Sequence, residues 1–425
     1  MNKNNLLRVI NDQRRDLVDR DVVERDVFVD LEKTGKSKFI VIISGIRRCG
    51  KSTLLQQLRK KNQKSDYYMN FDDERLINFG LSDFQMLHEL FIELYGEQDT
   101  FYFDEIQNIE GWERFVRRLH DEGKKVYITG SNASMLSKEL GTHLTGRYVQ
   151  VELFPFSFNE YLKYNKLSYD LRKSYNTNIK SVIRRYFSKY LKSGGMPEYI
   201  KTGNTDYLKR LYEGVLYRDI IARYKIASEK QIRELVYYSA SNIGKEISFN
   251  SLKSVVGLGS STTVKDYFGY LVNSYLIFLL EKYDLSLKKQ IYSNKKVYFI
   301  DNAIADNIGF RFSEDKGRFY ENLVCIELKR RKNEIYFHRG KNECDFVIKE
   351  GKKIVNVLQV CYSLDDKTIK TRELNGLAEA MKYYNLKRGL ILTDDEYDDI
   401  GYTFEKVKYQ LTIRPIWYWL LTGWV

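Results

Sequence analysis

The chain is poor in the residues that punctuate or cross-link a fold. Only three prolines occur in 425 residues, and no linker of low complexity or internal repeat is present, so domain boundaries must come from changes in hydrophobic pattern. The four cysteines, at positions 49, 325, 344 and 361, have no C-x-x-C spacing, which argues against a disulfide framework and against structural zinc. We expect a reduced, cytoplasmic protein.

Long hydrophobic runs are also missing. The opening stretch MNKNNLLRVINDQRRDL is charged throughout and has no apolar core of a secretory signal. The longest apolar runs, FIVIISGI and LVNSYLIFLL, are too short or too interrupted to span a bilayer. The apolar C-terminal stretch PIWYWLLTGWV is short, which predicts a docked tail rather than an anchor, and we expect no membrane partner.

Basic charge, by contrast, is plentiful. The chain has 70 Lys and Arg against 57 Asp and Glu, a net charge of +13, and its hydrophobic fraction of 43% is sufficient for globular cores. This length predicts two or three domains. A basic balance favours acidic partners, with nucleic acid first, although scattered lysines give the same total and charge alone names no partner.

The hydrophobic pattern changes along the chain. Short apolar runs alternate with helical stretches at 39–44, 66–71, 100–105, 125–131 and 148–153, which predicts a parallel sheet with helices on both faces. From about 157 to 285 the pattern is mainly helical. After 290 it predicts a helix, a three-strand meander, a helix and a strand.

The stretch GIRRCGKST follows the first apolar run and precedes a helical one. Gly45, Gly50, Lys51 and Ser52 satisfy the P-loop (Walker A) pattern G-x-x-x-x-G-K-[ST]. Backbone N–H groups of such a loop and the following helix N-terminus bind phosphate oxygens. Lys51 is expected to bridge the outer phosphates, and Ser52 to ligate Mg²⁺. The expected nucleotide-binding residues are Gly45, Ile46, Arg47, Arg48, Cys49, Gly50, Lys51, Ser52 and Thr53.

A second strand, FYFDEI, ends in the two carboxylates that a P-loop enzyme needs (Walker B). Asp104 is expected to hold Mg²⁺ through water, and Glu105 to orient and deprotonate the attacking water. Two adjacent acids at a strand end are also compatible with a helix N-cap.

Polar residues follow the next strand. Ser131 and Asn132 lie just past its end, where a side chain can contact the attacking water or the γ-phosphate. Arg147, in LTGRY, has two open interpretations: it reaches the phosphates of a neighbouring subunit, which implies a homo-oligomer, or it pairs with a surface acid.

These motifs, together with MNFDDERL, YITGSNASML, LTGRYVQVELFPFSFNEYL and SGGMPEYI, resemble the prokaryotic, mainly archaeal, AAA+-related ATPases that carry a C-terminal nuclease-like domain of unknown function. The resemblance implies ATP as substrate, Ser131 or Asn132 as sensor 1, and Arg147 as an arginine finger. It also implies a lid motif in GGMPE, with Pro197 against the nucleotide. Arg218 is open between a second sensor and an ion pair with Asp219.

Residues 229–283 have helix-turn-helix spacing and predict a winged-helix-like module. The hydroxyls of SSTTVKDY cap a helix that would present Thr262, Thr263, Lys265 and Lys253 to a DNA duplex. An interdomain brace of the same fold is the alternative.

The order α-β-β-β-α-β in the last third resembles the PD-(D/E)xK endonuclease core, with Glu321 and Asp345 as its metal-binding acids. Gln359 and Cys361 share one strand face, where an active enzyme has an acid or Gln and a Lys. A thiol supplies no positive charge at neutral pH, so cleavage is expected to be impaired unless Lys341 or Lys353 takes over. An alternative is that a soft metal binds Cys344, Cys361 and His338. Otherwise the two thiols are small buried side chains.

The sequence therefore predicts an ATPase core at 1–160, a helical lid at 161–228, a winged-helix-like module at 229–288 and a nuclease-like domain at 289–425. ATP and Mg²⁺ are the expected cofactors. Three functions remain open: an ATPase that remodels nucleic acid, a nucleotide-dependent scaffold for protein partners, and an ATP-gated nuclease.

Overall fold

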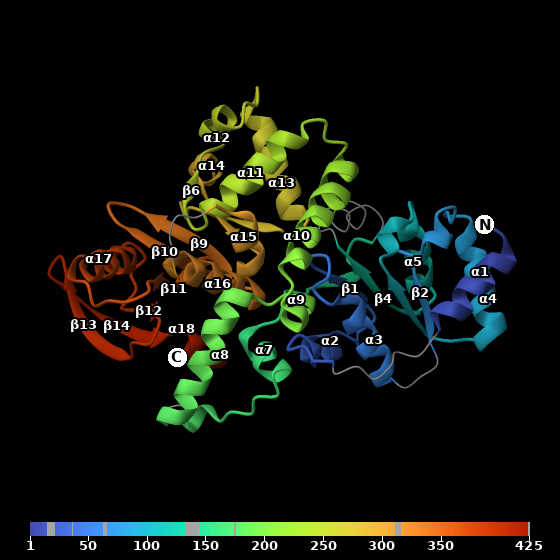
Figure 1. Cartoon of the computed structure of the whole chain (residues 1–425), viewed down its shortest axis with the longest axis horizontal. Helices are drawn as coiled ribbons and strands as arrows, with labels where there is room; N and C mark the ends of the chain where they lie inside the picture. Colours follow the sequence, from blue (N-terminus) through green and yellow to red (C-terminus); the bar gives the residue numbers. More distant parts are fainter. Residues whose placement is uncertain are drawn as a thin grey trace. The chain divides into compact units, whose positions relative to one another are not determined.

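The computed structural model describes residues 1–14, 22–35, 37–62, 66–131, 144–173, 176–310 and 316–423. The chain divides into two compact units. The first comprises Met1–Pro155 with Asn273–Tyr275, and the second comprises Phe156–Val272 with Leu276–Val425. In Figure 1 the first unit runs from blue to blue-green, and the second from green to red.

The first unit is built on a parallel sheet of strand order β2-β3-β4-β1-β5. Its strands are β1 (Ile40–Ser44), β2 (Tyr67–Asn70), β3 (Thr100–Asp104), β4 (Lys125–Gly130) and β5 (Tyr148–Glu152). Every residue of β1 is buried, as expected for a strand covered on both faces. The predicted parallel sheet is therefore confirmed, with ends that differ by a residue or so.

The helices of this unit are α1 (Lys3–Gln13), α2 (Phe28–Gly35), α3 (Lys51–Asn62), α4 (Asp83–Tyr95) and α5 (Trp112–Asp121), with short 3-10 turns η1 (Glu74–Leu76) and η2 (Ile106–Asn108). Helix α3 lies on one side of the sheet in Figure 1, and α4 and α5 lie on the other. This division follows from right-handed crossovers that run in opposite directions from β1 to β2 and from β2 to β4.

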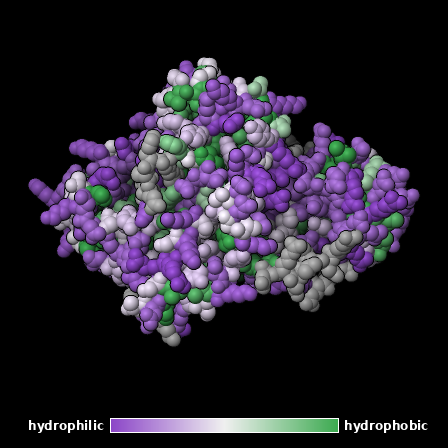
Figure 2. Space-filling view, viewed as in Figure 1, coloured by the Kyte–Doolittle hydropathy of each residue, from purple (hydrophilic) through white to green (hydrophobic). Residues whose placement is uncertain are grey.

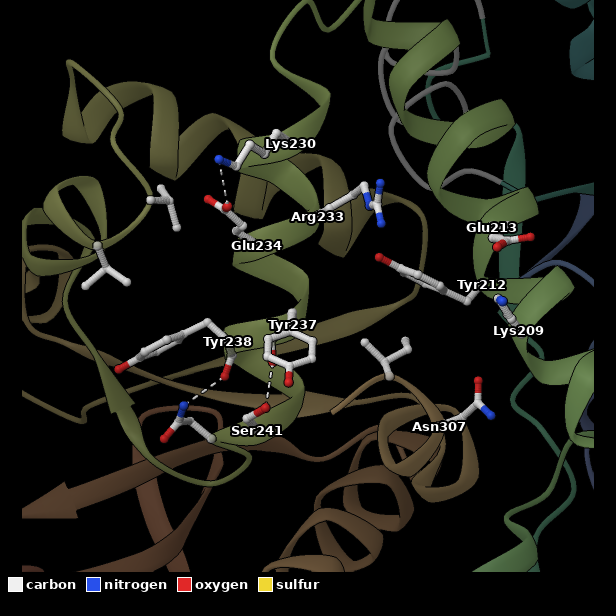
Figure 3. Close-up of a pocket in the computed structure, with 14 residues that line it drawn as sticks. Lys209, Tyr212, Glu213, Lys230, Arg233, Glu234, Tyr237, Tyr238, Ser241 and Asn307 are labelled. Carbon is white, nitrogen blue, oxygen red and sulfur yellow. Dashed lines mark hydrogen bonds and ion pairs between the residues drawn. The ribbon is translucent and has the colours of Figure 1, made fainter. Parts of the chain in front are cut away.

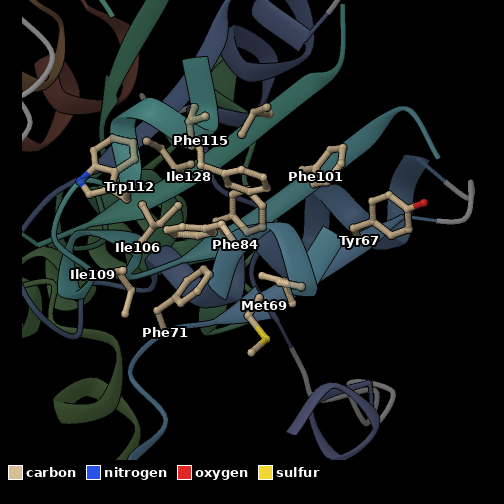
Figure 4. Close-up of a cluster of buried hydrophobic side chains, with 14 of the residues drawn as sticks. Tyr67, Met69, Phe71, Phe84, Phe101, Ile106, Ile109, Trp112, Phe115 and Ile128 are labelled. Carbon is tan, nitrogen blue, oxygen red and sulfur yellow. The ribbon is translucent and has the colours of Figure 1, made fainter. Parts of the chain in front are cut away.

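Aromatic side chains fill the space between this sheet and α4 and α5 (Figure 4). Phe84 stacks on Phe115 with ring centroids 4.5 Å apart, and Tyr67 stacks on Phe91 at 4.8 Å. This core holds β3 in position through Phe101 and Phe103. It therefore also positions the carboxylates of Asp104 and Glu105, which follow Phe103.

The second unit begins with helices. They are α7 (Phe158–Tyr164), η3 (Leu171–Lys173), α8 (Thr177–Ser193), α9 (Pro197–Thr202) and α10 (Thr205–Gly214), which continues into the π-helix η4 (Val215–Ala222). The glycines of GGMPE pack tightly here, because a Cβ on Gly195 would lie 2.3 Å from the Phe156 carbonyl oxygen. Gly195 N donates to Asp301 Oδ2 at 2.6 Å.

A small antiparallel sheet of order β6-β8-β7 follows. Its strands and helices are α11 (Glu229–Ser241), β6 (Glu246–Ile247), α12 (Phe249–Val255), α13 (Ser261–Asn273), β7 (Ile277–Glu281), α14 (Leu287–Tyr292) and β8 (Lys295–Phe299). Because β8 pairs with both β6 and β7, the sequence-based boundary at residue 288 falls inside this sheet.

The last sheet has the order β13-β14-β12-β11-β10-β9. Its elements are α15 (Asn302–Ile308), α16 (Lys316–Arg330), β9 (Glu334–Arg339), β10 (Glu343–Glu350), β11 (Lys353–Val360), α17 (Lys367–Tyr383), β12 (Arg388–Thr393), β13 (Asp398–Phe404), β14 (Val407–Pro415) and α18 (Ile416–Thr422). Strands β9, β10 and β11 form the predicted meander, and β12 pairs parallel to β11. The sequence analysis did not foresee the β13–β14 hairpin.

The C-terminal apolar stretch forms α18, where Trp417 and Trp419 are buried. Within the described ranges, no helix combines the length and the apolar character that crossing a membrane requires. On the face shown in Figure 2, hydrophilic residues predominate and hydrophobic residues form only small groups.

Candidate functional site

The P-loop joins β1 to α3 at the carboxyl edge of the first sheet. Gly45 and Gly50 have φ of 149° and 104°, and a Cβ on Gly45 would lie 2.2 Å from the Leu153 carbonyl oxygen. Both glycines are therefore required by the backbone. Among the other predicted nucleotide-binding residues, the Ile46 and Cys49 side chains are buried, whereas Arg48, Ser52 and Thr53 are exposed and Arg47 is half-buried.

Lys51, the first residue of α3, is buried beneath the loop. Its Nζ donates to the carbonyl oxygens of Gly45 at 3.1 Å and Ile46 at 3.2 Å. The same Nζ lies 3.7 Å from Glu105 Oε1, so the structure brings the loop lysine and the second acid of FYFDEI together.

Asp104 and Glu105 leave the end of β3 in different directions. Asp104 is 1% exposed and accepts a hydrogen bond from the Thr129 hydroxyl. Burial raises the pKa of the Asp104 carboxyl, while the Thr129 hydrogen bond opposes the rise. Glu105 has a left-handed backbone with φ of 51°, and its N–H donates to Thr129 Oγ1 at 2.9 Å.

The N-cap interpretation of these acids agrees with the backbone position of Glu105 but not with its side chain. Glu105 occupies the N-cap position of η2, but its side chain makes no capping hydrogen bond. Its Oε2 instead accepts from Gln107 Nε2 at 2.5 Å and from Ser131 Oγ at 3.4 Å. The carboxylate is thus held between Lys51, Gln107 and Ser131.

Mg²⁺ is the cation that this motif implies, and the donor set fits it. Hard cations of this kind take oxygen ligands. The Ser52 hydroxyl is close enough to the Asp104 carboxylate to lower the pKa of that carboxyl, so two such oxygens lie beside the loop.

Arg25 is a residue of this site that the sequence analysis missed. Its side chain is buried, with Nη1 donating to the Cys49 carbonyl at 2.9 Å and Nη2 to the Phe154 carbonyl at 2.5 Å. Arg25 therefore ties the P-loop to the segment after β5. Gln107 and Thr129 were missed as well, because no local spacing rule marks them.

The remaining predicted residues of the first half are less centrally placed. Arg147 Nε donates to Asp121 Oδ1 at 3.3 Å, an ion pair within the first unit. Asn132 lies outside the described residues. Pro197 is the first residue of α9, in the second unit. Arg218 and Asp219 lie in the π-helix η4, where Asp219 is buried and Arg218 is exposed.

The second unit contains a cluster of carboxylates around one buried lysine. Lys296 of β8 lies with Nζ at 2.9 Å from Glu321 Oε1, 3.2 Å from Asp345 Oδ1 and 2.5 Å from Glu343 Oε1. The Lys296 side chain is 1% exposed. The predicted pair Glu321 and Asp345 therefore does come together, but with Lys296 rather than with Lys341 or Lys353.

Gln359 also belongs to this cluster. Its Oε1 accepts from Asp345 N at 3.2 Å, and its Nε2 donates to the Glu373 carboxylate. Cys361 lies just past β11 and is buried, and burial raises the pKa of its thiol. A neutral thiol at this position supplies no charge to the carboxylates.

No soft-metal site is found in the described parts of the chain, where His, Cys, Asp and Glu form no group suited to a metal ion. Cys344 Sγ donates to the Leu358 carbonyl at 3.4 Å, and His338 Nδ1 lies 3.1 Å from the Tyr384 hydroxyl. The Cys344, Cys361 and His338 hypothesis therefore receives no support, and both thiols are buried.

A cleft of about 1160 Å³ opens over the carboxylate cluster. Its basic lining residues are Lys316, Arg318, Arg339, Lys341 and Arg372. Asp345, Gln359 and Cys361 also line it, so the predicted nuclease-like residues face this cleft. Its lining carries charges of both signs, because six acids lie beside the five basic residues: Glu321, Glu343, Asp345, Asp365, Asp366 and Glu373.

Two further features lie on the helices before this sheet. A pocket of about 780 Å³ is lined from α10 and α11, and Figure 3 shows Tyr212 pointing toward Arg233 across it. Burial raises the pKa of Tyr212 to about 12. On α13, Thr262 and Lys265 are exposed and Thr263 is half-buried, as is Lys253 on α12.

Two parts of the chain match known protein families. Residues 37–162 match an AAA domain, and residues 184–314 match a domain of unknown function (DUF8612). An uncharacterized protein of Haemophilus influenzae is 29% identical over 79% of this chain and 86% of its own.

Two solved structures match part of this chain at low sequence identity. The Thermotoga maritima RuvB Holliday junction branch migration motor is 13% identical, covers 60% of this chain and 89% of its own, and has a TM-score of 0.32. AMPPCP-bound DnaA from Aquifex aeolicus is 18% identical, covers 58% of this chain and 85% of its own, and has a TM-score of 0.26.

The uncharacterized protein MJ1544 of Methanocaldococcus jannaschii is similar over almost the whole length. It is 35% identical over 419 residues, which are 94% of this chain and 91% of that protein. The chain therefore belongs to the same family as MJ1544, and its N-terminal part is an AAA domain of the P-loop NTPase type.

Proposed function

We propose that the protein binds and hydrolyses ATP with Mg²⁺ at the P-loop site of the first unit. The observation that carries the proposal is the placement of Lys51 Nζ 3.7 Å from Glu105 Oε1, at the carboxyl edge of a parallel sheet. Ligands of open α/β sheets bind at this edge. An AAA domain at residues 37–162 supports the same reading.

The residues of the site divide the work of hydrolysis. The P-loop N–H groups and Lys51 bind the phosphates, and Ser52 and Asp104 would hold Mg²⁺, which neutralises phosphate charge when bound. Glu105 accepts the proton of the attacking water, since its carboxylate is held by Gln107 and Ser131 with one oxygen beside Lys51. The sensor role belongs to Ser131 or Asn132, and the trans role of Arg147 in a homo-oligomer is part of this proposal.

The proposed partner of the second unit is nucleic acid. The element order helix, strand, helix, helix, strand, helix, strand from α11 to β8 supports a winged-helix-like module with the short helix α14 inserted, which then extends through β8. The α-β-β-β-α-β order from α16 to β12 supports a nuclease-like domain. The net charge of +13 favours an acidic partner, and the five basic side chains in its cleft, which lie beside six acids, offer contacts to phosphate groups.

Steady-state ATP hydrolysis in Mg²⁺ tests the proposal. Wild type is compared with Glu105→Gln, without DNA and with single-stranded or duplex DNA, at two salt concentrations. Glu110→Gln serves as the matched control, because Glu110 is an exposed acid five positions along the same segment. We expect Glu105→Gln to lower turnover by about 100-fold or more, the contribution of a general base, and Glu110→Gln to change little.

The DNA arms separate the candidate functions. A salt-sensitive rise in wild-type turnover supports a nucleic-acid-coupled ATPase. Slow turnover that DNA leaves unchanged contradicts that coupling and favours a nucleotide-dependent scaffold for protein partners. Equal turnover in wild type and Glu105→Gln would contradict the ATPase site itself.

A further inference from the structure

The carboxylate cluster of the second unit is arranged around Lys296, a residue of the small sheet. Strand β8 pairs with β6 and β7, and its Lys296 side chain reaches Glu321 on α16 and the β10 acids. These elements all belong to one compact unit. The cluster is therefore shared by two sheets.

The Lys296 ammonium has no donor to spare. An ammonium group has three N–H donors, and Lys296 Nζ lies within 3.2 Å of three different carboxylates, on Glu321, Glu343 and Asp345. A lysine that activates water or contacts a scissile phosphate needs a free donor directed at that group. Lys296 is thus unsuited to replace the lysine that is absent at Cys361.

The carboxylate oxygens are occupied from other sides too. Asp345 Oδ2 accepts from Val360 N at 2.9 Å, and Glu321 Oε1 also accepts from the Tyr298 hydroxyl at 2.6 Å. The Glu343 carboxylate is also paired with Arg339. A divalent ion between Glu321 and Asp345 would have to displace these donors and would lie beside a buried ammonium.

We infer that Lys296 is a built-in cation that takes the place of the divalent metal in this nuclease-like centre. Because the ammonium already occupies the position between Glu321 Oε1 and Asp345 Oδ1, and like charges repel in a buried site, a metal ion cannot bind there while Lys296 is in place. Metal therefore does not fit the cluster as it stands. The inference rests on the proposed nuclease-like character of the domain, and it implies a nuclease-like centre that neither binds a divalent metal nor cuts nucleic acid.

Removing the ammonium should open a metal site. Lys296→Met leaves the Glu321, Glu343 and Asp345 carboxylates without their shared cation, and carboxylate oxygens suit Mn²⁺. We expect the full-length variant to bind one more Mn²⁺ than wild type in titrations followed by electron paramagnetic resonance. Mn²⁺ should raise the Tm of Lys296→Met by several degrees more than that of wild type.

Lys295→Met is the matched control. Lys295 is the neighbouring residue on β8, and its Nζ pairs with Glu281 Oε1 at 3.0 Å, outside the cluster. This variant should bind Mn²⁺ as wild type does. All titrations omit nucleotide and DNA, so that their outcome does not depend on ATP hydrolysis or on nucleic-acid binding.

A second variant keeps the inference falsifiable if Lys296→Met does not fold. Asp345→Asn should leave the Mn²⁺ binding of the otherwise wild-type chain unchanged, because Lys296 already excludes metal from the cluster. Loss of a Mn²⁺ site in Asp345→Asn would overturn the inference, as would a folded Lys296→Met that gains no site.

The DNA arm is separate. Affinity for duplex DNA, measured by fluorescence anisotropy, is expected to be the same in EDTA and in Mg²⁺ at matched ionic strength, and no cleavage should follow. Affinity that requires Mg²⁺ and is lost in Asp345→Asn would contradict a metal-free cleft. A failure to bind any DNA contradicts the proposed partner, whereas the Mn²⁺ titrations still decide the role of Lys296.

Discussion

Two buried lysines, one in each unit, lie beside carboxylates and differ in how completely those carboxylates hold them. Lys51 has one carboxylate at 3.7 Å and two backbone carbonyls as partners. Lys296 has three carboxylates between 2.5 and 3.2 Å. A lysine that binds an incoming phosphate must not already form close ion pairs with carboxylates. A lysine that neutralises a carboxylate cluster forms such ion pairs with every acid around it.

The acids beside the two lysines differ in the same way. Glu105 is held by side-chain donors from Gln107 and Ser131, which leaves its other oxygen near Lys51. Asp345 is buried, and burial together with the nearby Glu321 raises the pKa of its carboxyl well above the usual range, against the opposing effect of Lys296. The first arrangement is suited to chemistry on a ligand. In the second, the acids are already paired with Lys296.

Among the tests of this comparison, we expect Lys51→Ala to lower ATP turnover the most. The substitution removes the cation that contacts the phosphates, and loss of one such contact typically costs about 100- to 1000-fold in turnover. Steady-state ATP hydrolysis measures it, with Lys38→Ala, an exposed lysine before β1, as control. Turnover that survives Lys51→Ala would mean that the two lysines do not differ in function as proposed.

A site residue could be predicted from the sequence only where neighbouring residues form a recognisable motif with it. The P-loop follows from glycines and a lysine within one strand-loop-helix segment, and the Asp104–Glu105 pair follows from the end of an apolar strand. Arg25 and Lys296 carry no such signal, because each acts through contacts with segments distant in sequence.

The C-terminal sheet shows the same limit. The meander was predictable from its apolar strands and β12 from a short continuous apolar run, whereas the β13–β14 hairpin was missed. Along β13 the burial pattern shows exposed and half-buried residues only, since the strand lies at the sheet edge and its partner is β14 alone. An edge strand that buries little apolar surface gives a weak hydrophobic pattern.

A smaller effect is expected from Arg25→Ala, which loosens the loop above Lys51. Two hydrogen bonds from a charged donor to Cys49 and Phe154 are lost, and each contributes about 1.5–3 kcal/mol. We expect the KM for ATP to rise by about tenfold and the free energy of unfolding to fall by about 3 kcal/mol or more. Kinetics and thermal unfolding check both, with exposed Arg117→Ala as control. An unchanged KM would show that the loop needs no such anchor.

The smallest effect is expected from Gln107→Ala, which tests whether Glu105 is oriented rather than merely present. Without the Gln107 amide, Glu105 Oε2 loses its shortest side-chain contact, and a hydrogen bond to a charged group of about 1.5 kcal/mol corresponds to a fall in kcat of about tenfold or less. KM should stay constant, because Gln107 donates to the carboxylate and not to the phosphate-binding loop. Gln107→Glu is the sharper variant: a second carboxylate repels Glu105 as well as removing its amide donor, so kcat should fall further than in Gln107→Ala. Equal kcat values for the two variants would indicate that Gln107 only fills space.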